Sequence, residues 1–179
     1  MRILAMCGSL RAASSNRAAL EAAALLAPAG VEIALYDGLA ALPHFNPDLD
    51  DDPPPPAAAL RAEIGRCDGL LISSPEYAHG VAGTMKNALD WLVGSLEFPG
   101  TPVALINTSP RATLAQAQMR ETLATMSAAI VGDACIDLPL MGRGLDAEGV
   151  VADGPLSAAL RAALESFAQA IERAKAVSP

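Results

Sequence analysis

Short apolar runs alternate with longer amphipathic segments along this chain. The apolar runs have the length of buried strands, which we expect at Arg2–Cys7, Val31–Tyr36, Gly69–Ser73, Pro102–Asn107 and within Ile130–Leu138. The segments between them carry apolar residues at helical spacing, which predicts helices at Asn16–Ala27, Ala57–Arg66, Gly83–Val93, Ala112–Met126 and Leu156–Ala176. Strands that alternate with helices in this way predict right-handed βαβ units. We therefore expect an α/β fold, in which helices cover both faces of a parallel sheet, within a single domain spanning residues 1–179.

One long irregular segment, from Asp37 to about Pro56, interrupts the alternation. Its last part, Asp50–Pro56, contains four consecutive prolines, which exclude both helix and strand ladders. We expect an ordered loop or a stiff spacer there. Connections of this length in compact domains are often functional.

Three loops are candidates for a ligand site because they follow the first, third and fourth predicted strands. They are Gly8–Asn16, Ser73–Gly83 and Asn107–Arg111. In parallel sheets, ligands bind beyond the carboxyl ends of the strands, near the point where the strand order reverses. The three loops are therefore expected to lie side by side.

The loop Gly8–Asn16 combines a glycine, three serines, an asparagine and an arginine at a strand-to-helix turn. The start of a helix presents free N–H groups and favours negative charge, and the planar guanidinium of Arg11 matches phosphate oxygens. The loop has neither the second glycine of G-x-G-x-x-G nor the Gly-Lys-Ser/Thr of the P-loop. The composition therefore favours a phosphomonoester, such as that of flavin mononucleotide (FMN), over a dinucleotide or a nucleoside triphosphate.

The other two loops suit the remainder of such a ligand. Pro75 and Gly80 favour a rigid, sharply turned loop whose backbone groups can bond the polar edge of a flat heterocycle. Tyr77 is expected to pack against that ring, and Glu76 to orient a neighbouring loop or subunit. In the third loop, Thr108–Arg111 offers two hydroxyls and an arginine, which either reach the ligand or cap the following helix.

The composition narrows the classes of partner. A net charge of −8 argues against nucleic-acid binding, and no apolar run approaches the length of a membrane span. The chain also starts as a strand with no leader pattern, so we expect a cytoplasmic protein with its three cysteines reduced. The two histidines have no partners at ligand spacing, so no metal site is expected. Trp91 has two interpretations: a residue at a subunit interface, or part of the core.

These residues carry a family resemblance. Gly8–Arg11 with Ser15 and Asn16, followed by Pro75–Tyr77 and Lys86–Trp91, resembles the NADPH-dependent FMN reductase family of flavodoxin-like proteins. The resemblance implies a flavodoxin-like three-layer sandwich with strand order 2-1-3-4-5, FMN at the switch point, and a homodimer or homotetramer. The cofactor-binding residues that it and the third loop suggest are Ser9, Arg11, Ser15, Asn16, Pro75, Glu76, Tyr77, Ala78, Gly80, Ser109 and Arg111.

The sequence departs from the family pattern at two places. Ala78-His79 follows Pro-Glu-Tyr, where members often have asparagine, and Ser109–Thr113 replaces a loop that is often glycine-rich. The leading hypothesis is an enzyme that transfers hydride from NADPH or NADH to FMN, and then electrons to a quinone-like or other small acceptor. Hydride transfer needs no catalytic side chain, and none is predicted. Two alternatives stay open: a non-enzymatic FMN electron carrier, and a flavin-free signalling protein with the same fold.

Overall fold

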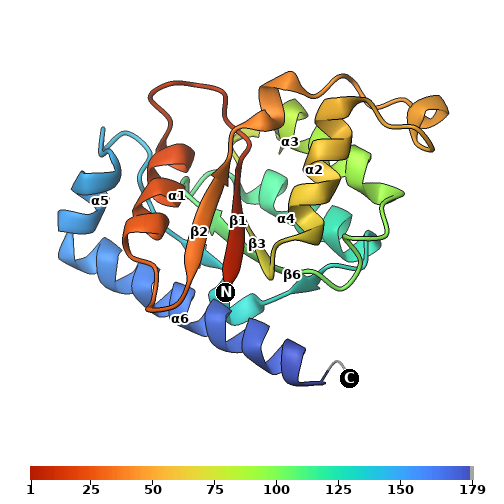
Figure 1. Cartoon of the computed structure of the whole chain (residues 1–179). Coiled ribbons are helices and arrows are strands. Elements are labelled where there is room, and N and C mark those ends of the chain that lie inside the picture. Colours follow the sequence, from red (N-terminus) through yellow and green to blue (C-terminus); the bar gives the residue numbers. More distant parts are fainter. Residues whose placement is uncertain (178–179) are drawn as a thin grey trace.

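A parallel sheet forms the centre of the molecule (Figure 1), which is known from a computed structural model. The structure describes residues 1–177, so residues 178 and 179 of the expected domain lie outside the described residues. The main strands are β1 (Arg2–Cys7), β2 (Glu32–Tyr36), β3 (Gly69–Ser73) and β6 (Pro102–Asn107). They are completed by the short strands β7 (Ala129–Ile130) and β8 (Ile136–Asp137), which both pair in parallel with β6. The order β2-β1-β3-β6-β7 confirms the predicted flavodoxin-like order 2-1-3-4-5.

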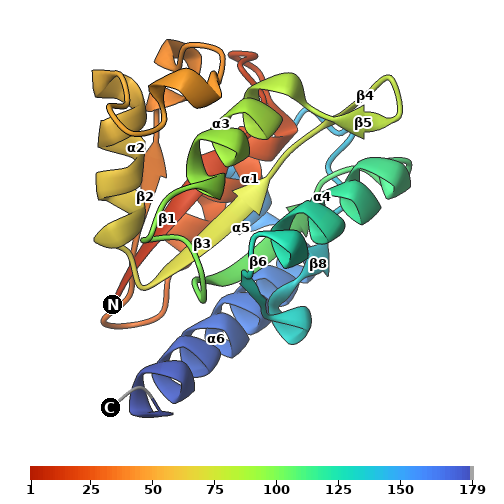
Figure 2. The same ribbon diagram turned by 90° about the vertical axis from the view of Figure 1, so that its right-hand side faces the viewer.

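Helices cover both faces of the sheet, as Figures 1 and 2 show. The helices are α1 (Ser15–Leu25), α2 (Pro55–Gly65), α3 (Gly83–Val93), α4 (Thr113–Thr125), α5 (Ala147–Ala152) and α6 (Gly154–Val177). Alternate residues of β1 point to opposite faces, because side chains alternate along a strand. Ile3 and Ala5 pack with α1, α5 and α6, whereas Leu4 and Met6 pack with α2, α3 and α4. The two apolar clusters are thus the two halves of a three-layer sandwich.

Four features differ from the predicted elements. The fifth strand is interrupted: a 3₁₀ turn at Gly132–Ala134 separates β7 from β8, and the main-chain N–H of Leu105 donates to the Sγ of Cys135 (3.4 Å). The helix α5 was not expected. A small antiparallel hairpin of β4 (Glu76–Tyr77) and β5 (Gly80–Val81) was also not expected. The long loop contains two 3₁₀ turns, and α2 begins at Pro55, where a proline suits the first helical turn.

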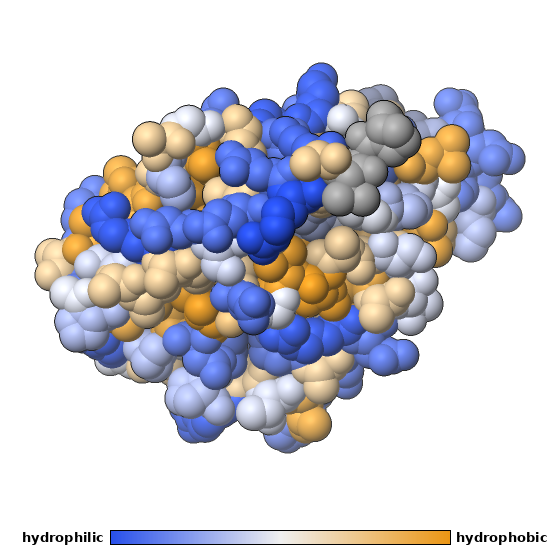
Figure 3. Space-filling view, turned by 90° about the horizontal axis from the view of Figure 1, so that it is seen from below, coloured by the Kyte–Doolittle hydropathy of each residue, from blue (hydrophilic) through white to orange (hydrophobic). Residues whose placement is uncertain are grey.

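The surface near α6 is mixed in polarity. Figure 3 views the molecule from below, on the side of the amino ends of the strands, and shows hydrophilic residues interspersed with smaller apolar areas. Among the helices that the structure describes, none is both long and apolar enough to cross a membrane. The hollow that concerns function lies at the opposite end, at the carboxyl ends of the strands.

Candidate functional site

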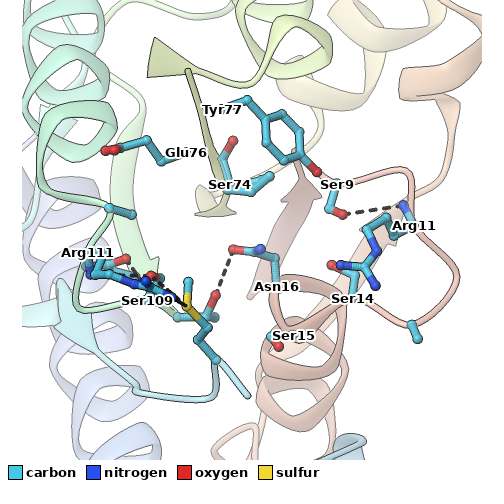
Figure 4. Close-up of a pocket in the computed structure, with 16 residues that line it drawn as sticks. Ser9, Arg11, Ser14, Ser15, Asn16, Ser74, Glu76, Tyr77, Ser109 and Arg111 are labelled. Atoms are coloured by element: carbon cyan, nitrogen blue, oxygen red, sulfur yellow. Dashed lines mark hydrogen bonds between the residues drawn. The ribbon is translucent and has the colours of Figure 1, made fainter. Parts of the chain in front are cut away.

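A cavity of about 360 Å³ opens where β1, β3 and β6 end (Figure 4). The chain reverses its direction across the sheet between β1 and β3, so the cavity lies at the topological switch point. The residues that line it come from the three predicted loops and one further segment: Ser9, Arg11, Ala13, Ser14, Ser15, Asn16, Ser74, Pro75, Glu76, Tyr77, Asn107, Thr108, Ser109, Arg111, Ala112 and Met141. The structure thus brings together nine of the eleven predicted site residues. Ala78 and Gly80 are not among the residues that line the cavity.

The start of α1 forms one end of the cavity. Ser14 is the N-cap residue, and its Oγ accepts a hydrogen bond from the main-chain N–H of Arg17 (3.3 Å). The N–H groups of the first turn are left without partners within the helix, and the helix dipole makes this end favourable for an anion. The Oγ of Ser9 accepts from the main-chain N–H of Arg11 (3.4 Å). Within residues 1–177 the guanidinium of Arg11 forms no ion pair, so its charge is available to a ligand.

Asn16 is a brace between the start of α1 and the ends of two strands. It is almost fully buried, and its Oδ1 accepts hydrogen bonds from the hydroxyls of Ser73 (2.9 Å) and Thr108 (3.1 Å). These bonds join the start of α1 to the ends of β3 and β6. Asn16 still lines the cavity, and its role toward a phosphate stays a prediction.

The floor of the cavity holds an unpaired buried hydroxyl. The Oγ of Ser74 is buried and has no hydrogen-bond partner in the part of the chain that the structure describes, and the residue is 5% exposed. A buried polar atom is normally paired, so this one fits a polar ligand. Ser74 approaches Gly8 so closely that a Cβ on the glycine would lie 2.2 Å from that Oγ. Gly8 is therefore needed for two neighbouring strands to end side by side beneath the site.

The thiol of Cys7 lies next to the loop that forms the anion-binding end. It donates to the carbonyl oxygen of Ser9 (3.5 Å), and burial raises the pKa of Cys7. The thiol therefore stays protonated near neutral pH. It adds no negative charge next to a loop that is suited to a phosphate.

The second loop forms another wall. The carboxylate Oε2 of Glu76 accepts from the main-chain N–H of Ala115 (2.8 Å), near the start of α4. Glu76 therefore joins the second loop to the first turn of α4, and its expected role in orienting a neighbouring loop or subunit stays a prediction. Tyr77 is half exposed at the edge of the cavity. The next residues, Ala78 and His79, both have positive φ angles and form the tip of the hairpin.

The third loop brings a second arginine to the cavity. The guanidinium of Arg111 donates to the Sδ of Met141 (3.1 Å), and the Oγ of Ser109 accepts from the main-chain N–H of Arg111 (3.3 Å). A thioether is a weak acceptor and does not neutralise the charge. The alternative that this loop caps α4 is not what the structure shows: the N-cap residue is Ala112, with no side-chain cap.

Several lining residues lie outside the predicted set. Ser14 is the clearest omission, because a serine directly before a helical segment is a strong N-cap signal. Asn107 is the last residue of a predicted strand and Thr108 follows it directly, which places both at the ligand edge. Met141 comes from the segment before α5, and no pattern in the sequence connects it to the site.

The interface interpretation of Trp91 is wrong, and the core interpretation is confirmed. The side chain is fully buried, its Nε1–H donates to the carbonyl oxygen of Pro43 (2.8 Å), and its ring meets Phe45 edge-on. The tryptophan thus anchors the long loop to α3. Lys86 and Asp90 do lie outside the core and form an ion pair along the same helix.

The fold and the position of the cavity define a flavodoxin-like α/β protein, and comparisons with known proteins narrow the class. Residues 1–138 match the NADPH-dependent FMN reductase family. An NAD(P)H-dependent FMN reductase of Pseudomonas aeruginosa is 33% identical over 159 residues, which cover 86% of this chain and 85% of the relative. A quinone reductase of Escherichia coli strain K12 is 34% identical over 113 residues, or 61% of this chain and 60% of the relative.

A solved structure agrees with these relatives. The flavoenzyme NAD(P)H:(acceptor) oxidoreductase from Paracoccus denitrificans superposes with a TM-score of 0.81 at 30% identity, covering 96% of this chain and 97% of that chain. The chain belongs to the NADPH-dependent FMN reductase family. It is therefore an oxidoreductase of a family that uses FMN and NAD(P)H, as the resemblance implied.

Proposed function

We propose that this protein binds FMN in the cavity at the switch point and uses NADPH or NADH to reduce a quinone-like or other small acceptor. The observation that carries the proposal is the end of the cavity formed by α1. There, a helix start, three serines and an arginine without an ion pair face the same space. This set of donors suits a phosphate dianion, and the unpaired Ser74 hydroxyl adds a polar group to the floor.

Each loop then has one task. Ser9, Arg11 and Ser15 hold the phosphate, and the brace formed by Asn16 keeps the loops at a fixed spacing. Tyr77 packs beside the flavin ring at the edge of the cavity. Bound FMN would supply the redox chemistry between the nicotinamide and the acceptor. No side chain of the protein has to act as nucleophile or base.

The third loop gives the cavity a second positive charge. Among residues 1–177, the side chain of Arg111 has only a thioether as partner, so its charge is available to attract the phosphates of the pyridine nucleotide or an anionic acceptor. The net charge of the chain is −8, whereas this cavity contains two arginines that form no ion pair with any described residue. We infer that these arginines draw anionic ligands into the site against the overall field.

An absorbance spectrum tests the proposal. We expect the purified protein, after addition of FMN and removal of excess cofactor, to show a bound flavin spectrum that bleaches when NADPH or NADH is added without oxygen. Addition of benzoquinone is expected to restore the colour. A protein that retains no FMN contradicts the proposal. Bound flavin that neither donor bleaches contradicts the enzymatic function and favours an electron carrier.

We also infer a homodimer or homotetramer. Leu10 and Tyr77 are both more than half exposed and line a second pocket beside the cavity, and exposed apolar side chains at such a place favour contact with a second subunit. Light scattering coupled to gel filtration measures the mass, and a monomer at micromolar concentration contradicts the inference. The cytoplasmic location stays a prediction from the sequence.

A further inference from the structure

The hairpin formed by β4 and β5 has an unfavourable turn. Its two central residues, Ala78 and His79, have φ angles of 48° and 62°. Two-residue hairpins of this type require positive φ at both positions and strongly prefer Asn-Gly there. Alanine and histidine carry a Cβ that disfavours the left-handed region, so the sequence of the turn does not by itself hold this conformation. Within the hairpin, Nδ1 of His79 lies 3.4 Å from Oε1 of Glu76, and further contacts reach the turn from outside the hairpin.

The helix α4 supplies these outside contacts. The side chain of Gln118 accepts from the main-chain N–H of Val81 (3.3 Å) and donates to the carbonyl oxygen of His79 (3.4 Å). One amide group thus bonds the backbone on both sides of Gly80. One turn earlier on the helix, the N–H of Ala115 donates to Glu76 at the beginning of the hairpin. Figure 2 shows the hairpin lying against this part of α4.

The hairpin also carries the wall of the cavity. Tyr77 directly precedes the strained turn and lines the cavity, whereas Gln118 is exposed and does not line it. Because Tyr77 is next to the turn in the chain, we expect opening of the turn to displace it. Gln118 therefore has no direct contact with a ligand in the cavity and acts only through the hairpin.

We propose that Gln118 is a positioning residue that holds the strained hairpin, and with it Tyr77, in the shape that receives the flavin. The inference rests on the proposed function in one respect, the packing of Tyr77 beside FMN. Glu76 contributes to the same attachment, but it also lines the cavity, so its variants would change the site directly. Gln118 gives the cleaner test.

The experiment compares Gln118→Ala with a matched control, Gln169→Ala, which replaces an exposed glutamine of α6. Hydrogen exchange of the segment 76–82, measured by mass spectrometry without added FMN, reports the opening of the hairpin. Loss of the two bonds from Gln118 is expected to speed exchange there about tenfold. The control is expected to leave it unchanged.

FMN binding supplies the second measurement. We expect Gln118→Ala to raise the dissociation constant about three- to tenfold, as measured by quenching of flavin fluorescence. The double change Ala78→Asn/His79→Gly supplies a turn that needs no support, so it is expected to restore both measurements in the Gln118→Ala background. Such a rescue distinguishes positioning of the hairpin from a general loss of stability.

Three results overturn the inference or part of it. Unchanged exchange of 76–82 in Gln118→Ala shows that the glutamine does not hold the turn. Faster exchange with a dissociation constant within twofold of the wild type shows that the turn does not shape the cavity. If even the wild-type protein fails to bind FMN, the proposed function fails and the flavin part of the inference with it, whereas the exchange measurement still decides whether Gln118 holds the hairpin.

Discussion

Gly8 is the position at which a single methyl group should most affect the site. In Gly8→Ala the new Cβ would lie 2.2 Å from the Oγ of Ser74, 2.7 Å from its Cβ and 3.1 Å from its Cα. Rotation of the serine side chain removes only the first of these contacts. The other two are also shorter than ordinary van der Waals separation, so the ends of β1 and β3 have to move apart.

The backbone around Gly8 resists such a movement. Its N–H donates to the carbonyl oxygen of Ser73 (2.9 Å), and its carbonyl oxygen accepts from the hydroxyl of Thr84 (2.8 Å). Overpacking of this kind costs about 2 kcal/mol. With a urea dependence of about 2 kcal/mol per molar, the midpoint of unfolding should fall by about 1 M. FMN binding should weaken as well, because Ser74 lines the cavity.

Urea unfolding followed by the fluorescence of the buried Trp91 measures the effect. The control is Gly132→Ala, at a glycine whose added Cβ meets nothing within 4 Å; its free energy of unfolding should change by less than about 0.5 kcal/mol. Ser74→Gly removes two of the three clashing atoms and should recover part of the loss in the Gly8→Ala background. Equal midpoints for Gly8→Ala and Gly132→Ala would refute the reasoning.

Three further changes test other parts of the structure. Arg11→Ala should weaken FMN binding about ten- to a hundredfold through loss of a charge-assisted bond, and dissociation constants within twofold of each other would contradict this role. Trp91→Phe leaves a small void and removes a hydrogen bond to the long loop, so thermal unfolding followed by circular dichroism should show a loss of about 2 kcal/mol. Hydrogen bonds from Arg2 and Arg66 hold the pKa of Glu63 below its ordinary value of 4.5. As the pH falls below 4.5, the unfolded state therefore binds more protons at Glu63 than the folded state does, and the stability that these bonds contribute is lost. In Glu63→Gln, the free energy of unfolding should depend less steeply on pH in this acid range. An unchanged pH dependence would contradict the assignment.

The order of the sheet and its covering helices could be predicted because they depend on periodicity. The residues of strand Arg2–Cys7 alternate between two buried faces, and helix Gly83–Val93 has one apolar stripe. The predicted bounds of both elements are the observed ones. The loops that approach the cavity could also be predicted, since the carboxyl ends of parallel strands share one edge. These inferences need only the local pattern and the rules of βαβ connection.

Other features depend on contacts between distant residues. Nothing near Trp91 in the sequence indicates that its indole N–H bonds Pro43, so its burial could not be separated from exposure at an interface. The contact of Arg111 with Met141, and the bonds of Gln118 to the hairpin, likewise join segments far apart in the chain. The interruption of the fifth strand arises at Gly132–Ala134, where the apolar pattern is too short to define a strand.

That interruption has a consequence for the behaviour of the protein in concentrated solution. A long, flat outer strand exposes a continuous row of unpaired N–H and C=O groups, onto which a strand from another molecule can add. Here the outer edge consists of two fragments of two residues each, separated by a turn of 3₁₀ helix. Neither fragment presents enough consecutive unpaired backbone groups for a strand of another molecule to add. The interrupted edge strand therefore protects this side of the sheet against ordered aggregation.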